Sequence, residues 1–163
     1  DEIFLNNIGQ PNRLFRILEE GNLEEIKLDV ALEEQGLGTG AAVADIDGDG
    51  ILELLISHGE SGAQPLSLFK ANISNSNYIR IKPLNSFGAP ARGATVILNT
   101  NLRNHAKTID AGSGYFCQME PVAHYGLRDG EKIENVSIKW TNGNVDTFEV
   151  KDINNTLEFK QGI

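Results

Sequence analysis

The sequence is poor in the residues that staple small proteins or bind soft metals. It has one cysteine, one methionine and three histidines among 163 residues. A lone Cys117 cannot form a disulfide within the chain, and it leaves the redox compartment undecided. The histidines, at positions 58, 105 and 124, are scattered and lack further soft ligands nearby. We therefore expect neither an intrachain disulfide nor a zinc site.

Basic residues and long apolar runs are also scarce. Fourteen Lys and Arg stand against 23 Asp and Glu, which gives a formal net charge of -9, and no basic cluster is present. Nucleic-acid binding depends on clustered Lys and Arg that displace counterions, so this composition excludes a nucleic-acid partner and favours cations and basic proteins. No apolar run approaches the roughly 20 residues that cross a bilayer, so we expect no membrane insertion.

The remaining composition is that of a globular protein, with 40% hydrophobic and 23% charged residues. This length suits one domain or two small ones. The chain begins at Asp1 without an initiator Met or a signal peptide. We interpret it as a processed product or as a fragment of a longer protein.

Short apolar stretches bounded by Gly, Pro, Asn or Asp recur along the whole chain and predict an all-β fold. A helix is conceivable only around residues 18–37, where Gly21 and Gly36 interrupt it. The polar stretch 72–77 marks a boundary, so we expect one domain at residues 1–72 and a second at 77–163. The strands of the first amount to about one and a half four-stranded sheets, the unit of a propeller blade.

In the second half, Ile79 and Ile81 alternate with polar residues and should point inward. The segment 141–144 carries an Asn-Gly pair that is typical of a tight hairpin. We expect this half to form a compact β-sandwich.

An acidic loop at residues 45–53 carries the strongest functional signal. Its odd positions supply four carboxylates and one backbone carbonyl, which can converge on one Ca²⁺ ion because calcium binds six to eight oxygens. Two glycines, Gly48 and Gly50, permit the positive φ angles of a tight loop. The predicted metal ligands are Asp45, Asp47, Asp49, Ile51 through its carbonyl, and Glu53.

This loop is not an EF-hand. An EF-hand needs a Glu at position 12, where Ile56 stands, and a helix on each side. The loop instead lies between two predicted strands, 41–44 and 52–56. An ion there would act mainly as a structural staple that adds stability by mass action. The alternative is a solvated acidic turn.

The residues from Gly38 to Leu55 resemble an FG-GAP or VCBS blade of an integrin-type β-propeller. The second half resembles the ASPIC/UnbV domain in four segments: residues 92–96, 112–118, 121–127 and 136–143. In this order the two resemble the C-terminal portion of the cartilage acidic protein family. The resemblance implies partial β-propeller blades followed by a β-sandwich, and a secreted calcium-binding glycoprotein of the extracellular matrix or cell surface that acts through protein contacts.

The family resemblance also implies partners: another protein, and the missing propeller blades if the chain is a fragment. Three glycosylation sequons, at Asn72, Asn135 and Asn154, fit a secreted protein. The main functional prediction is thus a protein-recognition or adhesion module.

Enzyme activity is not expected. Cys117 and His124 are seven residues apart, and such a pair can form a nucleophile and its base, but sequence spacing does not show their distance in space. The sequence has no Gly-rich phosphate loop. The alternative function is a carbohydrate-associated accessory module of a secreted protein, in which four aromatic residues stack on sugar rings: Tyr78, Tyr115, Tyr125 and Trp140.

Overall fold

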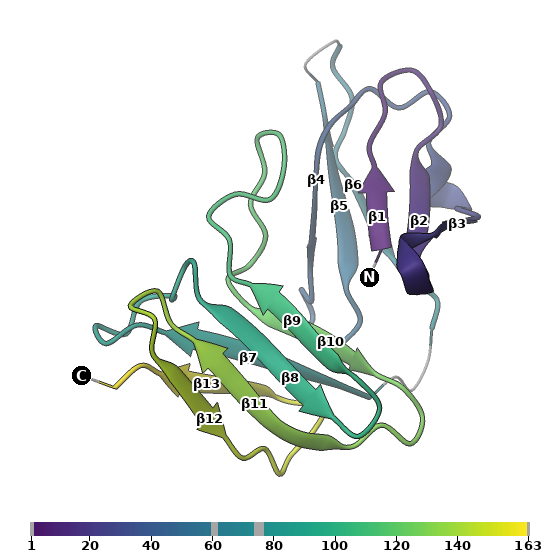
Figure 1. Cartoon of the computed structure of the whole chain (residues 1–163). Coiled ribbons are helices and arrows are strands. Elements are labelled where there is room, and N and C mark those ends of the chain that lie inside the picture. Colours follow the sequence, from purple (N-terminus) through teal and green to yellow (C-terminus); the bar gives the residue numbers. More distant parts are fainter. Residues whose placement is uncertain (1, 60–61, 74–76, 163) are drawn as a thin grey trace. The chain divides into compact units, whose positions relative to one another are not determined.

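The computed structural model describes residues 2–59, 62–73 and 77–162. Within these ranges the chain forms four small sheets and two single turns of 3-10 helix, and no α-helix. The all-β prediction is therefore confirmed. Figure 1 labels the strands and colours the chain along its sequence. In the described part of the chain, no helix has the length and apolar character to span a membrane.

The chain divides into two compact units that interleave in sequence. The first unit contains residues Asp1–Ala44, Leu52–Ala71 and Gly112–Gln118, and the second contains Asp45–Ile51, Asn72–Ala111 and Met119–Ile163. Two segments thus cross the predicted division at residues 72 and 77. The acidic loop groups with the second unit although it connects two strands of the first.

The first unit contains two antiparallel three-stranded sheets, in the orders β1-β2-β3 and β4-β5-β6. Their strands are β1 (Glu2–Leu5), β2 (Arg13–Ile17), β3 (Leu23–Ile26), β4 (Gly38–Ala44), β5 (Glu53–His58) and β6 (Ser67–Lys70). Each sheet is one strand smaller, in the described residues, than the four-stranded blade that the sequence suggested.

The helix considered for residues 18–37 is wrong. This segment contains 3-10 turns at Glu19–Gly21 and Val30–Leu32, with strand β3 between them. Two residues of this segment have left-handed backbones: Glu20, inside the first turn, with φ 63°, and Glu33, directly after the second turn, with φ 43°. A right-handed helix cannot pass through such residues, and β3 gains its hydrogen bonds from β2 instead.

The second unit contains two sheets, in the orders β10-β7-β13 and β12-β11-β8-β9. Strand β13 pairs with β7 in parallel, and the other pairs are antiparallel. The strands are β7 (Asn77–Leu84), β8 (Thr95–Thr100), β9 (Asn104–Thr108), β10 (Ala123–Leu127), β11 (Ile133–Lys139), β12 (Val145–Phe148) and β13 (Thr156–Lys160).

One hydrophobic core is shared by both sheets of this unit. Ile79 and Ile81 of β7 are 0% exposed, as the alternating pattern predicted. The core residues of the other sheet include Val96, Leu98, Val136, Ile138 and Trp140. Burial of such side chains contributes about 1.5–3 kcal/mol each, so this core is the main source of the unit's stability.

The predicted hairpin at residues 141–144 is confirmed. Strands β11 and β12 pair up to Lys139 and Val145, and the amide of Trp140 donates to the carbonyl of Asn144 at 2.9 Å. Gly143 has a φ of 91°, a backbone that glycine adopts without strain.

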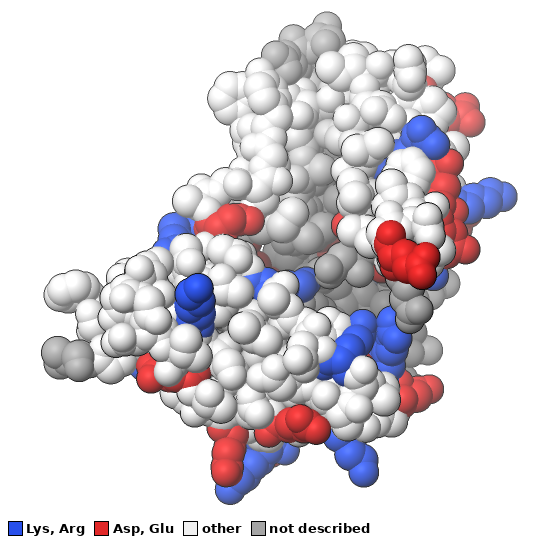
Figure 2. Space-filling model, viewed as in Figure 1, with Lys and Arg blue, Asp and Glu red and all other residues white. Residues whose placement is uncertain are grey.

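Charged side chains do not gather in one place on the face shown in Figure 2. Acidic and basic groups lie there in small separate groups, and most of that face is uncharged. On that face, the acidic groups therefore do not form a single patch.

Candidate metal centre

The acidic loop Asp45–Ile51 is a tight turn built by its own side chains. Asp45 Oδ2 accepts a hydrogen bond from the amide of Gly50 at 3.1 Å, and Asp49 Oδ1 accepts one from the amide of Ile51 at 2.9 Å. Such Asx bonds replace the ladder bonds that the backbone loses on leaving a strand. Gly48 and Gly50 have φ angles of 79° and 85°, as the sequence predicted.

Three carboxylates converge at this loop. One oxygen each from Asp45, Asp47 and Asp49 lies within 4.8 Å of the others. Asp45 is buried, whereas the other two are exposed to solvent. Asp45 Oδ1 is buried and accepts no hydrogen bond. An ionised oxygen in that state costs several kcal/mol, and a cation offsets this cost, so the three carboxylates could hold a metal ion.

The donor set decides which metals fit. All three groups are hard carboxylate oxygens, which suit Ca²⁺, Mg²⁺ and Mn²⁺ and do not favour the softer transition metals. The remaining predicted ligands, the Ile51 carbonyl and Glu53, stay predictions. Glu53 begins β5, is buried, and forms an ion pair with Lys70 at 3.3 Å. It is not a member of the three-carboxylate cluster.

Arg80 forms an ion pair with the buried carboxylate of Asp45. Arg80 Nη1 is 3.2 Å from Asp45 Oδ2, and Arg80 Nη2 is 2.5 Å from Glu120 Oε2. The Arg80 side chain is itself only 13% exposed. One side of Asp45 is thus neutralised within the protein, while Oδ1 is left for another cation.

Two aromatic rings complete the surroundings of the loop. The Nε2 atom of His124 is 2.8 Å from the carbonyl oxygen of Gly50, and the Tyr78 hydroxyl donates to the carbonyl of Gly48 at 3.4 Å. Burial lowers the pKa of His124 below its ordinary value, so its ring is neutral at pH 7.

Sequence reasoning did not place Tyr78, Arg80 or His124 beside the loop, although it considered Tyr78 for sugar stacking and His124 for a Cys/His pair. They lie 27 or more residues after Ile51, the last residue of the loop. The loop's own pattern contains no signal for them, since only the pairing of β7 with β10 places them together.

The family comparisons agree with the resemblance in the sequence. Residues 85–163 match the model of the ASPIC and UnbV family. Over 96% of its length the chain is 47% identical to cartilage acidic protein 1 of Homo sapiens, 46% to that of Mus musculus and 44% to that of Xenopus tropicalis.

The chain is a homologue of cartilage acidic protein 1. It spans about a quarter of the length of these relatives. Two of the residues beside the acidic loop, Glu120 and His124, fall inside the ASPIC and UnbV match, whereas Tyr78 and Arg80 precede it.

Cys117 and His124, the pair considered in the sequence, fall in different compact units. Cys117 belongs to the first compact unit, and His124 belongs to the second, where its Nε2 faces the Gly50 carbonyl. The histidine thus has a partner in the acidic loop.

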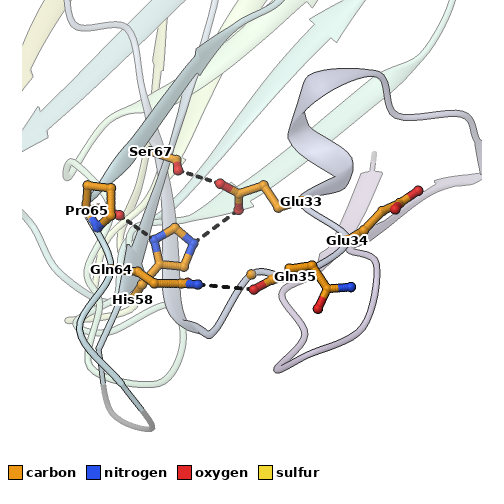
Figure 3. Close-up of a pocket in the computed structure, with 8 residues that line it drawn as sticks. Glu33, Glu34, Gln35, His58, Gln64, Pro65 and Ser67 are labelled. Atoms are coloured by element: carbon orange, nitrogen blue, oxygen red, sulfur yellow. Dashed lines mark hydrogen bonds and ion pairs between the residues drawn. The ribbon is translucent and has the colours of Figure 1, made fainter.

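An open pocket of about 530 Å³ lies in the first unit (Figure 3). His58, 3% exposed, has Nε2 at 3.2 Å from Glu33 Oε2 and Nδ1 at 2.7 Å from the carbonyl of Pro65. Ser67 donates to the other oxygen of Glu33. The carboxylate therefore lies between serine and histidine, whereas nucleophile activation needs the imidazole beside the serine. This arrangement holds chain segments together and does not form a catalytic triad.

Two of the aromatic residues considered for sugar stacking belong to the core. Trp140 and Tyr125 are each 2% exposed, and the Tyr125 hydroxyl donates to the Val96 carbonyl at 2.9 Å. Tyr115 is 57% exposed and packs edge-to-face with Phe116 at 4.5 Å between ring centroids.

The three sequons differ in accessibility. Asn72 is exposed, although Ser74 of its sequon lies outside the described residues. Asn135 is half-buried within β11 and accepts a hydrogen bond from Asn99 at 2.6 Å. Asn154 accepts one from the Tyr78 amide at 2.9 Å. Asn72 and Asn154 are both exposed, whereas Asn135 is half-buried.

Proposed function

We propose that this chain is part of an extracellular calcium-binding protein of the matrix or cell surface, which acts as a protein-recognition or adhesion module. The observation that carries the calcium site is the unsatisfied Oδ1 of Asp45, buried beside two further carboxylates. The name of the relatives, cartilage acidic protein 1, and the exposed Asn72 of a glycosylation sequon support an extracellular setting.

Calcium at this loop has a structural role. Without an ion, three carboxylates within 4.8 Å of one another repel. Binding to the folded loop stabilises it by mass action, which amounts to about 1.4 kcal/mol when free calcium is tenfold above the dissociation constant. A dissociation constant of about 10⁻⁴–10⁻³ M is typical of extracellular calcium modules.

The experiment is a thermal melt with calcium and with chelator, together with calorimetric titration of Ca²⁺ and Mg²⁺. We expect calcium to raise the melting temperature of the wild type by several degrees. Asp47→Ala should lose this increase. Asp152→Ala, which removes the same charge at another exposed position, should keep it. A wild type whose melting temperature is the same in calcium and chelator would contradict the proposal.

The first unit is proposed to consist of β-propeller blade strands of the FG-GAP/VCBS type, and the second to be a β-sandwich. Large apolar side chains of the first unit are exposed, including Leu23 (55%), Val30 (78%) and Leu68 (55%). Further blades of a longer protein would cover such residues. In a version of the protein with the full length of the relatives, Leu23 and Leu68 should therefore be protected from hydroxyl-radical oxidation. Unchanged reactivity would argue against this packing.

The exposed pair Tyr115 and Phe116 supports a protein partner, because exposed aromatic side chains often anchor protein interfaces. Phe116→Ser should weaken binding to extracellular proteins without changing calcium affinity. Binding to a glycan array that is lost in the same variant would instead favour a carbohydrate-associated module.

A further inference from the structure

One face of strands β7 and β10 forms a seat for the acidic loop. Arg80 of β7 and His124 of β10 are direct partners across the two strands, and Tyr78 is two residues from Arg80 on the same face. The Tyr78 and His124 rings are parallel to within 4°, with 5.9 Å between their centroids. All three side chains contact the loop, and all belong to the second unit.

His124 and Tyr78 contact backbone carbonyls of the loop, and Arg80 contacts its buried carboxylate, Asp45. Since the Gly50 carbonyl can only accept, the Nε2 atom of His124 carries the hydrogen in their 2.8 Å bond. The Tyr78 ring lies so close to Gly50 that a Cβ there would be 2.0 Å from ring atom Cδ1. The loop is thus clamped at Gly50 by both rings.

Gly50 in turn orients the buried metal ligand. Its amide donates to Asp45 Oδ2 at 3.1 Å, on the same oxygen that Arg80 approaches to 3.2 Å. These two donors occupy Oδ2 and leave Oδ1 without a partner. Anything that fixes Gly50 therefore fixes which oxygen of Asp45 is free to bind a cation.

We propose that His124 is a positioning residue for the metal loop. By its hydrogen bond to the Gly50 carbonyl, His124 holds the loop against the sheet β10-β7-β13, so the affinity of the loop for the ion depends on that sheet. This inference rests on the proposed calcium site. Residues that hold a metal ligand in place without touching the metal typically contribute tenfold or more to affinity. His124 is such a residue for Asp45, because it bonds to Gly50, whose amide donates to Asp45.

The experiment compares wild type, His124→Ala, His124→Gln and the control His105→Ala by calcium calorimetry at pH 7.4. His105 is a second partly buried histidine of this unit, and it contacts Glu131 and Tyr125. We expect about tenfold weaker calcium binding in His124→Ala. His124→Gln should recover most of the affinity, because its amide nitrogen can donate in place of Nε2. His105→Ala should bind calcium as the wild type does.

Amide hydrogen exchange without calcium provides a second measurement. The Gly50 amide donates to Asp45 and the Ile51 amide donates to Asp49. Both amides should exchange about tenfold faster in His124→Ala than in the wild type. In His124→Gln they should exchange at the wild-type rates. Equal calcium affinity in wild type and His124→Ala would overturn the inference, even if the melting temperature fell. If the wild type bound no calcium, the calcium proposal would fail, and unchanged exchange in His124→Ala would then separately overturn the positioning role.

Discussion

Glu131 is the carboxylate whose removal should most affect the stability of the second unit. Its side chain is 0% exposed and accepts hydrogen bonds from Arg103 Nε at 2.9 Å, Arg103 Nη2 at 3.0 Å and the Thr100 hydroxyl at 2.9 Å. The Arg128 amide donates a further bond at 2.9 Å. Burial alone would raise the pKa of Glu131, but these donors outweigh it and lower the pKa to about 2.

The magnitude follows from linkage. The pKa of Glu131 falls from 4.5 to about 2 on folding, so the ionised form contributes about 3 kcal/mol to the free energy of unfolding at pH 7. Because the folded pKa is the lower one, this contribution is fully present above pH 4.5. It is lost as the pH falls toward 2, with about two-fifths remaining near pH 3.

Glu131→Gln should therefore lower the free energy of unfolding by about 3 kcal/mol at pH 7 and by less than half of that at pH 3. Urea unfolding of both proteins at the two pH values measures this difference. Trp140, the single tryptophan, is 2% exposed in the core of the same unit, so its fluorescence reports on this unit.

Glu158→Gln is the matched control. Glu158 pairs with Lys82 at 2.6 Å, but its side chain is 54% exposed. Exposed ion pairs contribute about 0–1 kcal/mol, so this variant should unfold nearly as the wild type does. A constant difference between wild type and Glu131→Gln from pH 7 to pH 3 would refute the assignment of the effect to the ionised carboxylate.

Two further substitutions test the loop seat and the first unit. Gly50→Ala places a Cβ against the Tyr78 ring at a backbone φ of 85°. Gly48 also has a positive φ, but a Cβ there meets nothing within 4 Å, so Gly50→Ala should reduce calcium affinity more than Gly48→Ala. Equal losses of affinity in calorimetry would contradict this. Asn12→Ala removes a 2%-exposed side chain that accepts from the Asn7 amide at 2.9 Å and donates to the Ala31 carbonyl at 3.1 Å. It should destabilise the first unit by about 1–3 kcal/mol, seen as faster amide exchange in β1 and β2 with β7 unchanged; equal acceleration in β7 would show a global effect instead.

Local patterns in the sequence predicted most of the strands and the residues of the three-carboxylate cluster. Alternation at Ile79 and Ile81, and the Asn-Gly pair before Asn144, depend on backbone geometry within a few residues. The same is true of Asp45, Asp47 and Asp49, whose spacing and neighbouring glycines shape the loop by themselves. The helix considered for residues 18–37 failed because left-handed residues and pairing of β3 with β2 prevailed over a weak local signal.

By itself, then, the sequence determined the all-β class, the inward alternation of Ile79 and Ile81, and the acidic loop with its oxygen-rich side chains. Only the tertiary structure decided that Arg80 neutralises one side of Asp45 and that Tyr78 and His124 hold Gly50. The pairing of β7 with β10, which are about 40 residues apart in the chain, places these residues side by side. Contacts of that kind depend on how distant strands pair, and no short stretch of sequence encodes them.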